Sequence, residues 1–285
     1  MSERYDIAII GSGPAGLSAA INAKIRNKSI IVFGNEDFSN KLMRAPKVDN
    51  YLGFYGVTGK DLKDKFKEHI SSMDINIIYE KINNVYALGE YFTLMVADKS
   101  YEAKKVILST GIEFSKPLKG EEKFLGRGAS YCATCDAPLY KNKTVAIVGY
   151  NEESQKEANF LSEIANKVYY IPMYKCKYDL LDTIEIVEDK PIEIVGNLKV
   201  EKLILKEREI EAEGIFILKD SVPPSELVPG LEMEEGHIKV NRDMLTNIPG
   251  CFAAGDCTGK PYQYMKAAGE GQIAALSAVS ELDNK

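Results

Sequence analysis

Apolar residues occur along the chain in short runs that alternate with amphipathic stretches. Residues 5–10, YDIAII, form an almost continuous apolar run, which is typical of a strand buried on both faces. Between Leu17 and Ile25 the apolar positions recur at helical spacing, and a second apolar run, SIIVF, follows at residues 29–33. The pattern predicts a strand, a helix and another strand at the start of the chain.

Two later segments repeat parts of this pattern. Residues 145–149, VAIVG, end a β-branched run in a glycine, and residues 251–256, CFAAGD, read as a short strand. The stretch from Met265 to Ala278 reads as a helix with small residues on its packing side. Because one core rarely grows beyond about 250–300 residues, the 285 residues are expected to form two domains of the α/β class.

Composition narrows the choice of partners and compartment. The net charge of −6 argues against a nucleic-acid partner, which needs a basic surface. No apolar run approaches the roughly 18 residues of a membrane span, and the chain enters its first strand directly, so we expect neither a membrane anchor nor a signal peptide and place the protein in the cytoplasm. In that compartment the five cysteines are not expected to form a disulfide framework.

A glycine turn follows the first predicted strand. Gly11, Gly13 and Gly16 form the pattern G-x-G-x-x-G, in which the glycines permit a tight turn, a close approach of a pyrophosphate and close packing of the helix on the strand. Pro14 suits the first helical turn, whose unpaired N–H groups favour phosphate. Glu36 stands 20 residues beyond Gly16, where a ribose-binding acid is expected. The alternative is a glycine-rich turn that binds no ligand.

Three motifs in order carry a resemblance to a known family. GSGPAG at residues 11–16, the pair Thr110-Gly111 and FAAGD at residues 252–256 resemble the flavoprotein disulfide reductases. In that family FAD lies extended, and the acid of the GD step binds its ribitol. The resemblance assigns this role to Asp256.

A C-x-x-C motif provides the candidate chemistry. Cys132 and Cys135 stand within disulfide reach across one turn. A zinc site would need two further ligands, but no second C-x-x-C is present, and both histidines, His69 and His237, lie in charged surroundings. A redox dithiol is therefore preferred to a metal site or a structural thiol pair, and we interpret the other three cysteines, Cys176, Cys251 and Cys257, as structural.

The string GRGASYCATCDAP at residues 126–138, followed by YKNKTVAIVG, resembles the low-molecular-weight thioredoxin reductases, as does KVDNYLGF at residues 47–54. The resemblance covers almost the whole chain. It implies two Rossmann-like domains, the second inserted into the FAD domain, with boundaries at 1–112, 113–219 and 220–285. The insert of this sequence is shorter than a full nucleotide-binding domain. It also implies that Cys135 faces the flavin, that Cys132 exchanges with thioredoxin, that Asp136 donates a proton and that the protein is a homodimer.

The same resemblance implies where FAD is bound. The family's GGQL segment is replaced by SNKL, with Lys41 at the glutamine position, and Tyr262 stands where the family has arginine. The expected FAD contacts are Gly11, Ser12, Gly13, Pro14, Ala15, Gly16, Glu36, Lys41, Asn50, Val85, Thr110, Gly111, Gly255, Asp256 and Gln263.

The family's contacts to NADPH are missing from the inserted domain. The second glycine loop keeps only Gly149, and Glu152 and Glu153 stand at the expected helix start. Each carboxylate would repel a phosphate about 6 Å away by roughly 2–3 kcal/mol at an effective dielectric constant near 20. Residues 172–174, Pro-Met-Tyr, replace the family's His-Arg-Arg, whose arginines bind the 2′-phosphate of NADPH. Lys219-Asp220 replaces the Ile-Gly step that closes the family's inserted domain.

Because the dithiol is retained while the nucleotide contacts are lost, we expect a different electron source. The pattern is similar to the ferredoxin-dependent flavin thioredoxin reductases, which lack a pyridine-nucleotide site. We therefore expect ferredoxin as donor and thioredoxin as acceptor. Lysines at residues 141–143 or in the segment 60–69 could form a basic docking patch, although the latter alternate with acids as a solvated helix face does.

Three alternatives remain open at this point. An NADPH-dependent thioredoxin reductase with an unusual site would retain the nucleotide. A flavin dithiol oxidase would oxidise small dithiols and reduce oxygen. A flavoprotein that only senses redox state would not turn over with thioredoxin.

Overall fold

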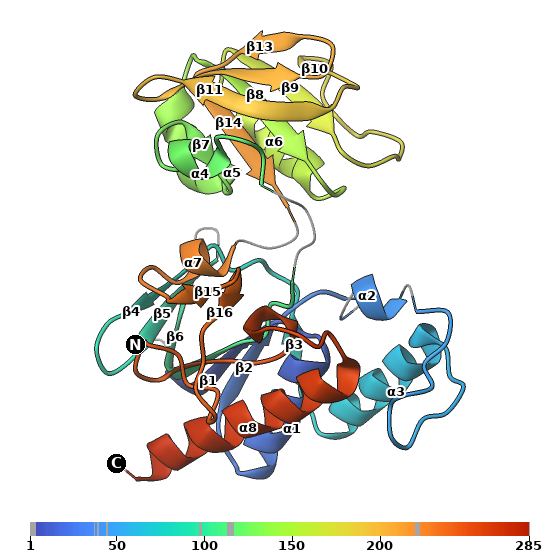
Figure 1. The fold of residues 1–285 in the computed structure, drawn as a ribbon. Helices are drawn as coiled ribbons and strands as arrows, with labels where there is room; N and C mark the ends of the chain where they lie inside the picture. Colours follow the sequence, from blue (N-terminus) through green and yellow to red (C-terminus); the bar gives the residue numbers. More distant parts are fainter. Residues whose placement is uncertain are drawn as a thin grey trace. The chain divides into compact units, whose positions relative to one another are not determined.

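The computed structural model describes residues 4–36, 38, 40–43, 45–96, 99–112, 117–219 and 223–284, without the side chains of residues 40, 41 and 135. The chain divides into two compact units (Figure 1). One comprises Met1–Glu113 together with Pro223–Lys285, and the other comprises Phe114–Val222. The second unit is thus inserted in the sequence of the first.

The first unit is built on a sheet that is parallel at its centre. The order is β3-β2-β1-β6-β5-β4; β1, β2, β3 and β6 run parallel, and β4 and β5 add antiparallel strands at one edge. The parallel strand β17 pairs with the second half of β6. The strand bounds are β1 Tyr5–Ile10, β2 Ile30–Phe33, β3 Ile77–Ile78, β4 Asn84–Ala87, β5 Phe92–Val96, β6 Lys99–Leu108 and β17 Cys251–Ala253, with a separate pair β15 Met233–Glu234 and β16 His237–Ile238.

Helices α1 (Pro14–Ile25) and α8 (Tyr264–Asp283) lie side by side against this sheet (Figure 1). Small residues allow the close approach, since a Cβ atom at Gly271 would lie 2.0 Å from the backbone oxygen of Ala15. The helix predicted over residues 265–278 is confirmed, and α8 continues for five residues beyond Ala278. The other helices of this unit are α2 Asn40–Met43, α3 Gly59–Ser72, α7 Pro224–Leu227 and the 3-10 turn η2 Asp256–Thr258.

The second unit contains a five-stranded parallel sheet and a smaller antiparallel one. The parallel sheet has the order β10-β9-β8-β14-β7, and β11, β12 and β13 form the second sheet. The strand bounds are β7 Ala129–Ser130, β8 Thr144–Gly149, β9 Lys167–Pro172, β10 Ile184–Ile186, β11 Pro191–Gly196, β12 Val200–Leu205, β13 Glu209–Glu211 and β14 Gly214–Leu218; the helices are α4 Glu121–Phe124, α5 Ala133–Asp136, η1 Ala137–Tyr140 and α6 Ser154–Ser162.

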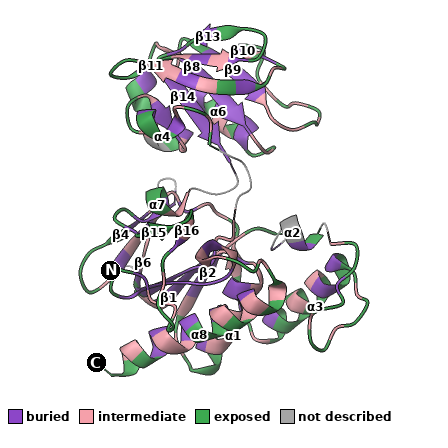
Figure 2. Ribbon diagram, in the orientation of Figure 1, coloured by how far each residue is buried: buried purple, intermediate pink, exposed green. Residues whose placement is uncertain are grey.

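Burial follows the hydrophobic pattern of the sequence. The last four residues of β1, all of β14 and five of the six residues of β8 are buried, as expected for strands covered on both faces (Figure 2). Both units therefore contain a parallel sheet between covering layers, and the predicted α/β class is confirmed. Among the described helices, none is long and apolar enough to cross a membrane.

Candidate active site and cofactor site

The first glycine loop joins β1 to α1 and leaves the start of this helix open. Gly11 has φ +116°, and a Cβ at Gly16 would lie 1.8 Å from the Gly11 oxygen, so both positions need glycine. A Cβ at Gly13 would have no described atom within 4 Å. No side chain caps the helix at Gly13 and its first turn carries no acid, so the first N–H groups can face a phosphate.

Ser12 connects this loop to the segment after β2. Its hydroxyl accepts a hydrogen bond from the Asn35 N–H at 2.9 Å and lies 3.2 Å from the Asn35 oxygen, to which it donates. The adjacent Glu36 is exposed. The hydrogen bonds between Asn35 and Ser12 thus hold Glu36, the predicted ribose-binding acid, beside the glycine loop.

Thr110 presents an unusual group at the end of β6. Within the described part of the chain, its hydroxyl is the only buried side-chain oxygen or nitrogen without a hydrogen-bond partner. The neighbouring Ser109 hydroxyl, by contrast, donates to the Ile10 and Gly11 oxygens at 2.9 and 3.0 Å. Because an unpaired buried hydroxyl is costly, Thr110 fits a position that a bound cofactor completes.

The Gly255-Asp256 step is fixed by an ion pair on α8. Glu270 accepts hydrogen bonds from the Gly255 N–H at 2.9 Å and the Thr258 hydroxyl at 2.8 Å. Lys266 lies 2.9 Å from Glu270 and donates to the Gly255 oxygen at 2.8 Å. Gly255 adopts φ +93°, which favours glycine. Sequence reasoning missed Lys266 and Glu270, which carry no motif and act only through this contact.

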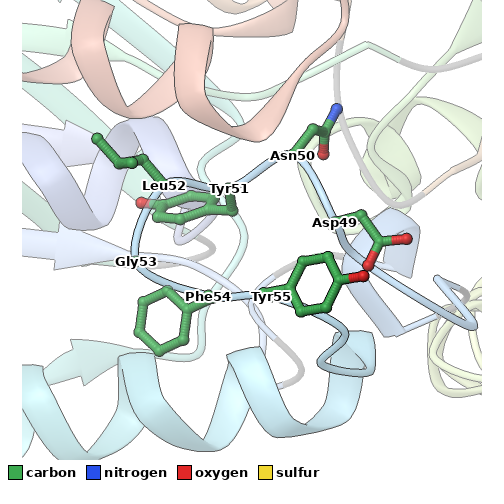
Figure 3. Close-up of a pocket in the computed structure, with 7 residues that line it drawn as sticks. All are labelled: Asp49, Asn50, Tyr51, Leu52, Gly53, Phe54 and Tyr55. Carbon is green, nitrogen blue, oxygen red and sulfur yellow. The ribbon is translucent and has the colours of Figure 1, made fainter.

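Asn50 and Gln263 are brought together from distant parts of the chain. The Asn50 amide donates to the Gln263 side-chain oxygen at 2.7 Å. Asn50 belongs to the loop Asp49–Tyr55, which lines a pocket of about 450 Å³. Figure 3 shows the Tyr51 and Asn50 side chains on opposite sides of this loop. Two predicted FAD contacts thus meet at one place in the first unit.

Of the two other predicted contacts, Val85 stands apart from this group, and the position of the Lys41 side chain is not described. Val85 lies in the edge strand β4, separated from β1 by β5 and β6, and it is fully buried in the core. The Lys41 side chain lies outside the described residues. Both assignments stay predictions.

The C-x-x-C segment crosses from β7 into α5. Cys132 is disulfide-bonded and half-buried, and the Cys135 side chain lies outside the described residues, so the predicted pairing stays a prediction. The Ser130 hydroxyl accepts from the Cys132 N–H at 3.1 Å and donates to the Cys132 oxygen at 3.2 Å. The Cys132 sulfur lies 3.4 Å from the Thr134 hydroxyl. One serine thus holds the backbone of the candidate exchanging cysteine.

Asp136 ends α5 and lies near Tyr140. Burial raises the pKa of Tyr140, and the negative charge of Asp136 raises it further. Asp136 itself is half-buried and so keeps some exposure to solvent. This position is compatible with the predicted proton donor.

The second glycine loop, between β8 and α6, differs sharply from the first. The Asn151 side chain accepts from the Ser154 N–H at 2.9 Å. The backbone oxygens of Glu152 and Glu153 accept from the N–H groups of Gln155 and Lys156, respectively, at 3.1 Å each. The start of α6 is therefore closed by its own chain. Glu152 and Glu153 are exposed beside it.

The segment after β9 is also tied internally. Tyr174 stands at a position where the family has arginine, and its hydroxyl lies 2.9 Å from the Tyr170 hydroxyl and accepts from the Gln155 amide at 2.7 Å. Tyr170 in turn lies 2.6 Å from the Ser154 hydroxyl. Burial raises the pKa of Tyr170, so this hydroxyl keeps its proton.

A buried ion pair lies at the end of β14. The Lys219 ammonium is 3.5 Å from Glu121, and their side chains are 4% and 1% exposed. Glu121 also accepts from the Tyr131 hydroxyl and the Leu118 N–H, both at 2.7 Å, and the Lys219 ammonium lies 5.5 Å from the centre of the Tyr150 ring. Sequence reasoning noted Lys219 as a departure but missed its partner. A lysine directly after a fully apolar strand is the feature of the sequence that could have indicated a buried acidic partner.

The remaining cysteines are free thiols. Cys251 and Cys257 are buried, and burial raises their pKa values to about 12 and about 11. Cys176 is half-buried and receives a hydrogen bond from Gln155. The described residues contain no group of three or more histidine, cysteine or acidic side chains that could hold a metal ion.

Comparison with known proteins identifies the family. The model of a family described as pyridine nucleotide-disulphide oxidoreductase matches residues 5–172 and 181–271. The chain belongs to this family. The match to the pyridine nucleotide-disulphide oxidoreductases omits residues 173–180, the segment that begins within the missing arginine motif.

Relatives within this family narrow the assignment. The thioredoxin reductase of Aquifex aeolicus (strain VF5) is 34% identical over an alignment of 304 positions that covers 99% of this chain and 94% of the relative. The crystal structure of a ferredoxin-flavin thioredoxin reductase from Clostridium acetobutylicum is 66% identical, with a TM-score of 0.96 and full coverage of both chains. A thioredoxin reductase from Gloeobacter violaceus is 26% identical, with a TM-score of 0.82 and coverage of 99% and 95%.

The predicted resemblance is confirmed, and the chain is an oxidoreductase of the thioredoxin reductase family, whose members bind FAD. The residues of the first unit fit this cofactor. The open start of α1 suits its pyrophosphate, and the unpaired Thr110 hydroxyl is placed to receive a polar atom. Which of the predicted residues contact FAD stays a prediction.

Proposed function

We propose that this protein takes electrons from reduced ferredoxin and passes them, through FAD and the Cys132–Cys135 pair, to thioredoxin without using NADPH. The observation that carries the proposal is the closed start of α6. A helix that binds a pyrophosphate offers unpaired N–H groups to it. The N–H groups of Ser154, Gln155 and Lys156 are already bonded to their own chain, whereas the start of α1 is uncapped.

Charge at the second loop supports the same conclusion. Glu152 and Glu153 are exposed next to the bonded N–H groups, and a diphosphate placed there would face two carboxylates. The positive end of a helix is equivalent to only about half a charge. Repulsion therefore outweighs the attraction that remains at this helix start.

At the other positions where the family contacts the nucleotide, the side chains of this protein bind one another. Tyr174, in place of an arginine, bonds Tyr170 and Gln155. Lys219, in place of the isoleucine of the family's closing Ile-Gly, is buried against Glu121. A nucleotide at these positions would have to break buried polar bonds, each of which costs about 1–3 kcal/mol when one partner is left unpaired.

Ferredoxin is strong enough as a donor. Plant-type ferredoxins have potentials near −400 mV and thioredoxin one near −270 mV. Two electrons that pass over this difference of roughly 130 mV release about 6 kcal/mol. When bound, FAD supplies the ability to accept electrons singly and to release them as a pair. The similarity to a ferredoxin-flavin thioredoxin reductase agrees with this donor.

The protein's own residues perform the disulfide exchange. Two electrons and two protons convert the Cys132–Cys135 disulfide to two thiols. The Cys132 thiolate attacks the thioredoxin disulfide, which forms a mixed disulfide and releases one thioredoxin sulfur. Cys135 then attacks Cys132, which releases the second sulfur, and Asp136 supplies a proton to a departing thiolate.

Anaerobic reduction of the flavin tests the electron source. Purified protein is mixed with reduced ferredoxin or with NADPH, and flavin absorbance and thioredoxin thiols are followed. We expect ferredoxin to bleach the flavin and reduce thioredoxin, and NADPH to do neither at a comparable rate. Rapid bleaching by NADPH would overturn the proposal, as would thioredoxin that stays oxidised with ferredoxin.

Two controls complete this experiment. The variant Cys132→Ser should still be bleached by ferredoxin but should not reduce thioredoxin, because only the exchanging sulfur is lost. Oxygen uptake with a small dithiol distinguishes a dithiol oxidase, for which uptake would be fast and thioredoxin irrelevant. Sedimentation equilibrium tests the homodimer that we also propose.

A further inference from the structure

A carboxylate contacts the backbone between the two cysteines of the C-x-x-C segment. Glu157, in the first turn of α6, accepts a hydrogen bond from the Ala133 N–H at 3.1 Å. Ala133 is fully buried and directly follows Cys132, while Glu157 is half-buried. The acid therefore lies against the backbone that directly follows Cys132, although Ala133 and Glu157 are 24 residues apart in the sequence.

The N–H group that Glu157 occupies has a specific value for thiol chemistry. Thiolates in C-x-x-C motifs are stabilised by N–H donors and positive charge near the start of the following helix. Glu157 engages the first N–H after Cys132 and brings a negative charge to the same place. Both effects disfavour the thiolate form of Cys132.

A disfavoured thiolate makes a dithiol a better reductant. The reverse case is known in disulfide oxidoreductases, where a strongly stabilised reduced form produces an oxidising pair. A protein that must deliver electrons to thioredoxin needs a dithiol with a low reduction potential. Ser130 already holds the Cys132 backbone by two hydrogen bonds, so Glu157 is not required merely to keep this turn in place.

We propose that Glu157 is a positioning residue that disfavours the thiolate form of Cys132 and so makes the dithiol more strongly reducing. This rests on the proposed role of Cys132 as the exchanging thiol but not on the electron donor. The test therefore uses neither ferredoxin nor NADPH, so its failure and the failure of the proposed donor can be told apart.

The experiment measures alkylation of Cys132 against pH in the FAD-loaded protein. Cys135→Ser leaves Cys132 as the only thiol of the motif, and iodoacetamide labelling is followed in the tryptic peptide 128–141 by mass spectrometry. In this background, Glu157→Gln removes the charge and keeps an acceptor for Ala133. We expect the midpoint of the alkylation profile to move about 0.5–1 pH unit lower, the scale of one charge interaction at a half-buried site.

Three further variants separate charge from structure. Glu157→Asp keeps the charge and should stay within about 0.3 pH unit of the parent, and Glu157→Ala should shift at least as far as Glu157→Gln. Glu163→Gln removes an exposed acid just after the same helix and should not shift the midpoint. The other titratable side chains of α5, η1 and α6, Asp136, Tyr140 and Lys156, are present in every variant, so their effects cancel.

A second measurement uses the protein with both cysteines present. Equilibration with thioredoxin under nitrogen, at a pH above the alkylation midpoints of both parent and variant, gives the ratio of the two dithiols. There Glu157→Gln should lower the equilibrium constant for thioredoxin reduction roughly threefold to tenfold. An unchanged alkylation midpoint in both Glu157→Gln and Glu157→Ala would overturn the proposal, and so would an equal shift in Glu163→Gln. If one of the Glu157 variants fails to retain FAD, the other variant and the equilibrium measurement decide the outcome.

Discussion

The Lys219 ammonium lies 3.5 Å from the Glu121 carboxylate, and both side chains are almost entirely buried. The two residues are 98 positions apart and meet because β14 ends next to the start of α4. A buried pair adds little net stability when it replaces apolar residues, but it is costly to break. The pair therefore fills this space with side chains of the protein itself.

Loss of one member of this pair should destabilise the second unit. Lys219→Met leaves the Glu121 charge buried with fewer partners and should lower the free energy of unfolding by about 3 kcal/mol. The double variant Lys219→Met with Glu121→Gln should recover most of this loss. Hydrogen exchange of the β14 amides measures the effect in this unit alone. Exchange in Lys219→Met as slow as in the parent would contradict the prediction.

Two glycines of the first loop should respond differently to alanine. Gly16→Ala places a Cβ 1.8 Å from the Gly11 oxygen and should lower the stability of the apoprotein by about 2–3 kcal/mol. Gly13→Ala meets open space at φ −72°, so apoprotein stability should change by less than about 0.5 kcal/mol. FAD affinity should nevertheless fall at least about tenfold in Gly13→Ala, since one clash or one lost hydrogen bond is worth about 1–3 kcal/mol. Thermal unfolding and flavin titration of the two apoproteins check both statements.

Glu270 should control FAD binding through the Gly255-Asp256 step. Glu270→Ala leaves the Gly255 N–H and the Lys266 ammonium without this acceptor. We expect flavin affinity to fall about tenfold, since an unpaired buried group costs about 1–3 kcal/mol. Glu270→Gln retains an acceptor and should lose less. Equal affinities of the parent and Glu270→Ala in fluorescence titrations would refute this role.

Alkaline pH should destabilise the fold through two buried thiols. Burial raises the pKa of Cys251 to about 12 and that of Cys257 to about 11, above the ordinary value of 9.0. From about pH 9 upward the unfolded chain loses these protons while the folded chain keeps them, so the free energy of unfolding falls as pH rises. Urea unfolding between pH 8 and 11 measures the slope. The double variant Cys251→Ala with Cys257→Ala should show a shallower one.

The local order of the first unit could be predicted from the sequence. The apolar run 5–10, the glycines after it and the helical spacing beyond Pro14 are consecutive signals, and β1 and α1 begin and end where these signals place them. The differences in the second loop were equally readable, because two missing glycines and two acids are visible in the sequence itself.

The interactions that replace the lost nucleotide contacts could not be predicted from the sequence. Asn151 is close in sequence to the N–H group that it caps, but its rotamer depends on how α6 packs. The contacts of Glu157 with Ala133 and of Glu121 with Lys219 join segments 24 and 98 residues apart. No periodicity or motif marks either acid.

The sequence by itself determined the strand-glycine-helix units, the dithiol and the family, because backbone conformation and hydrophobic period are encoded in neighbouring residues. Only the tertiary structure decided which charges meet at the ends of the strands of the second unit. The order β8-β14-β7 brings together side chains that the chain holds far apart, and burial there makes each unpaired polar group costly. The parallel sheet therefore sets the surroundings of Cys132.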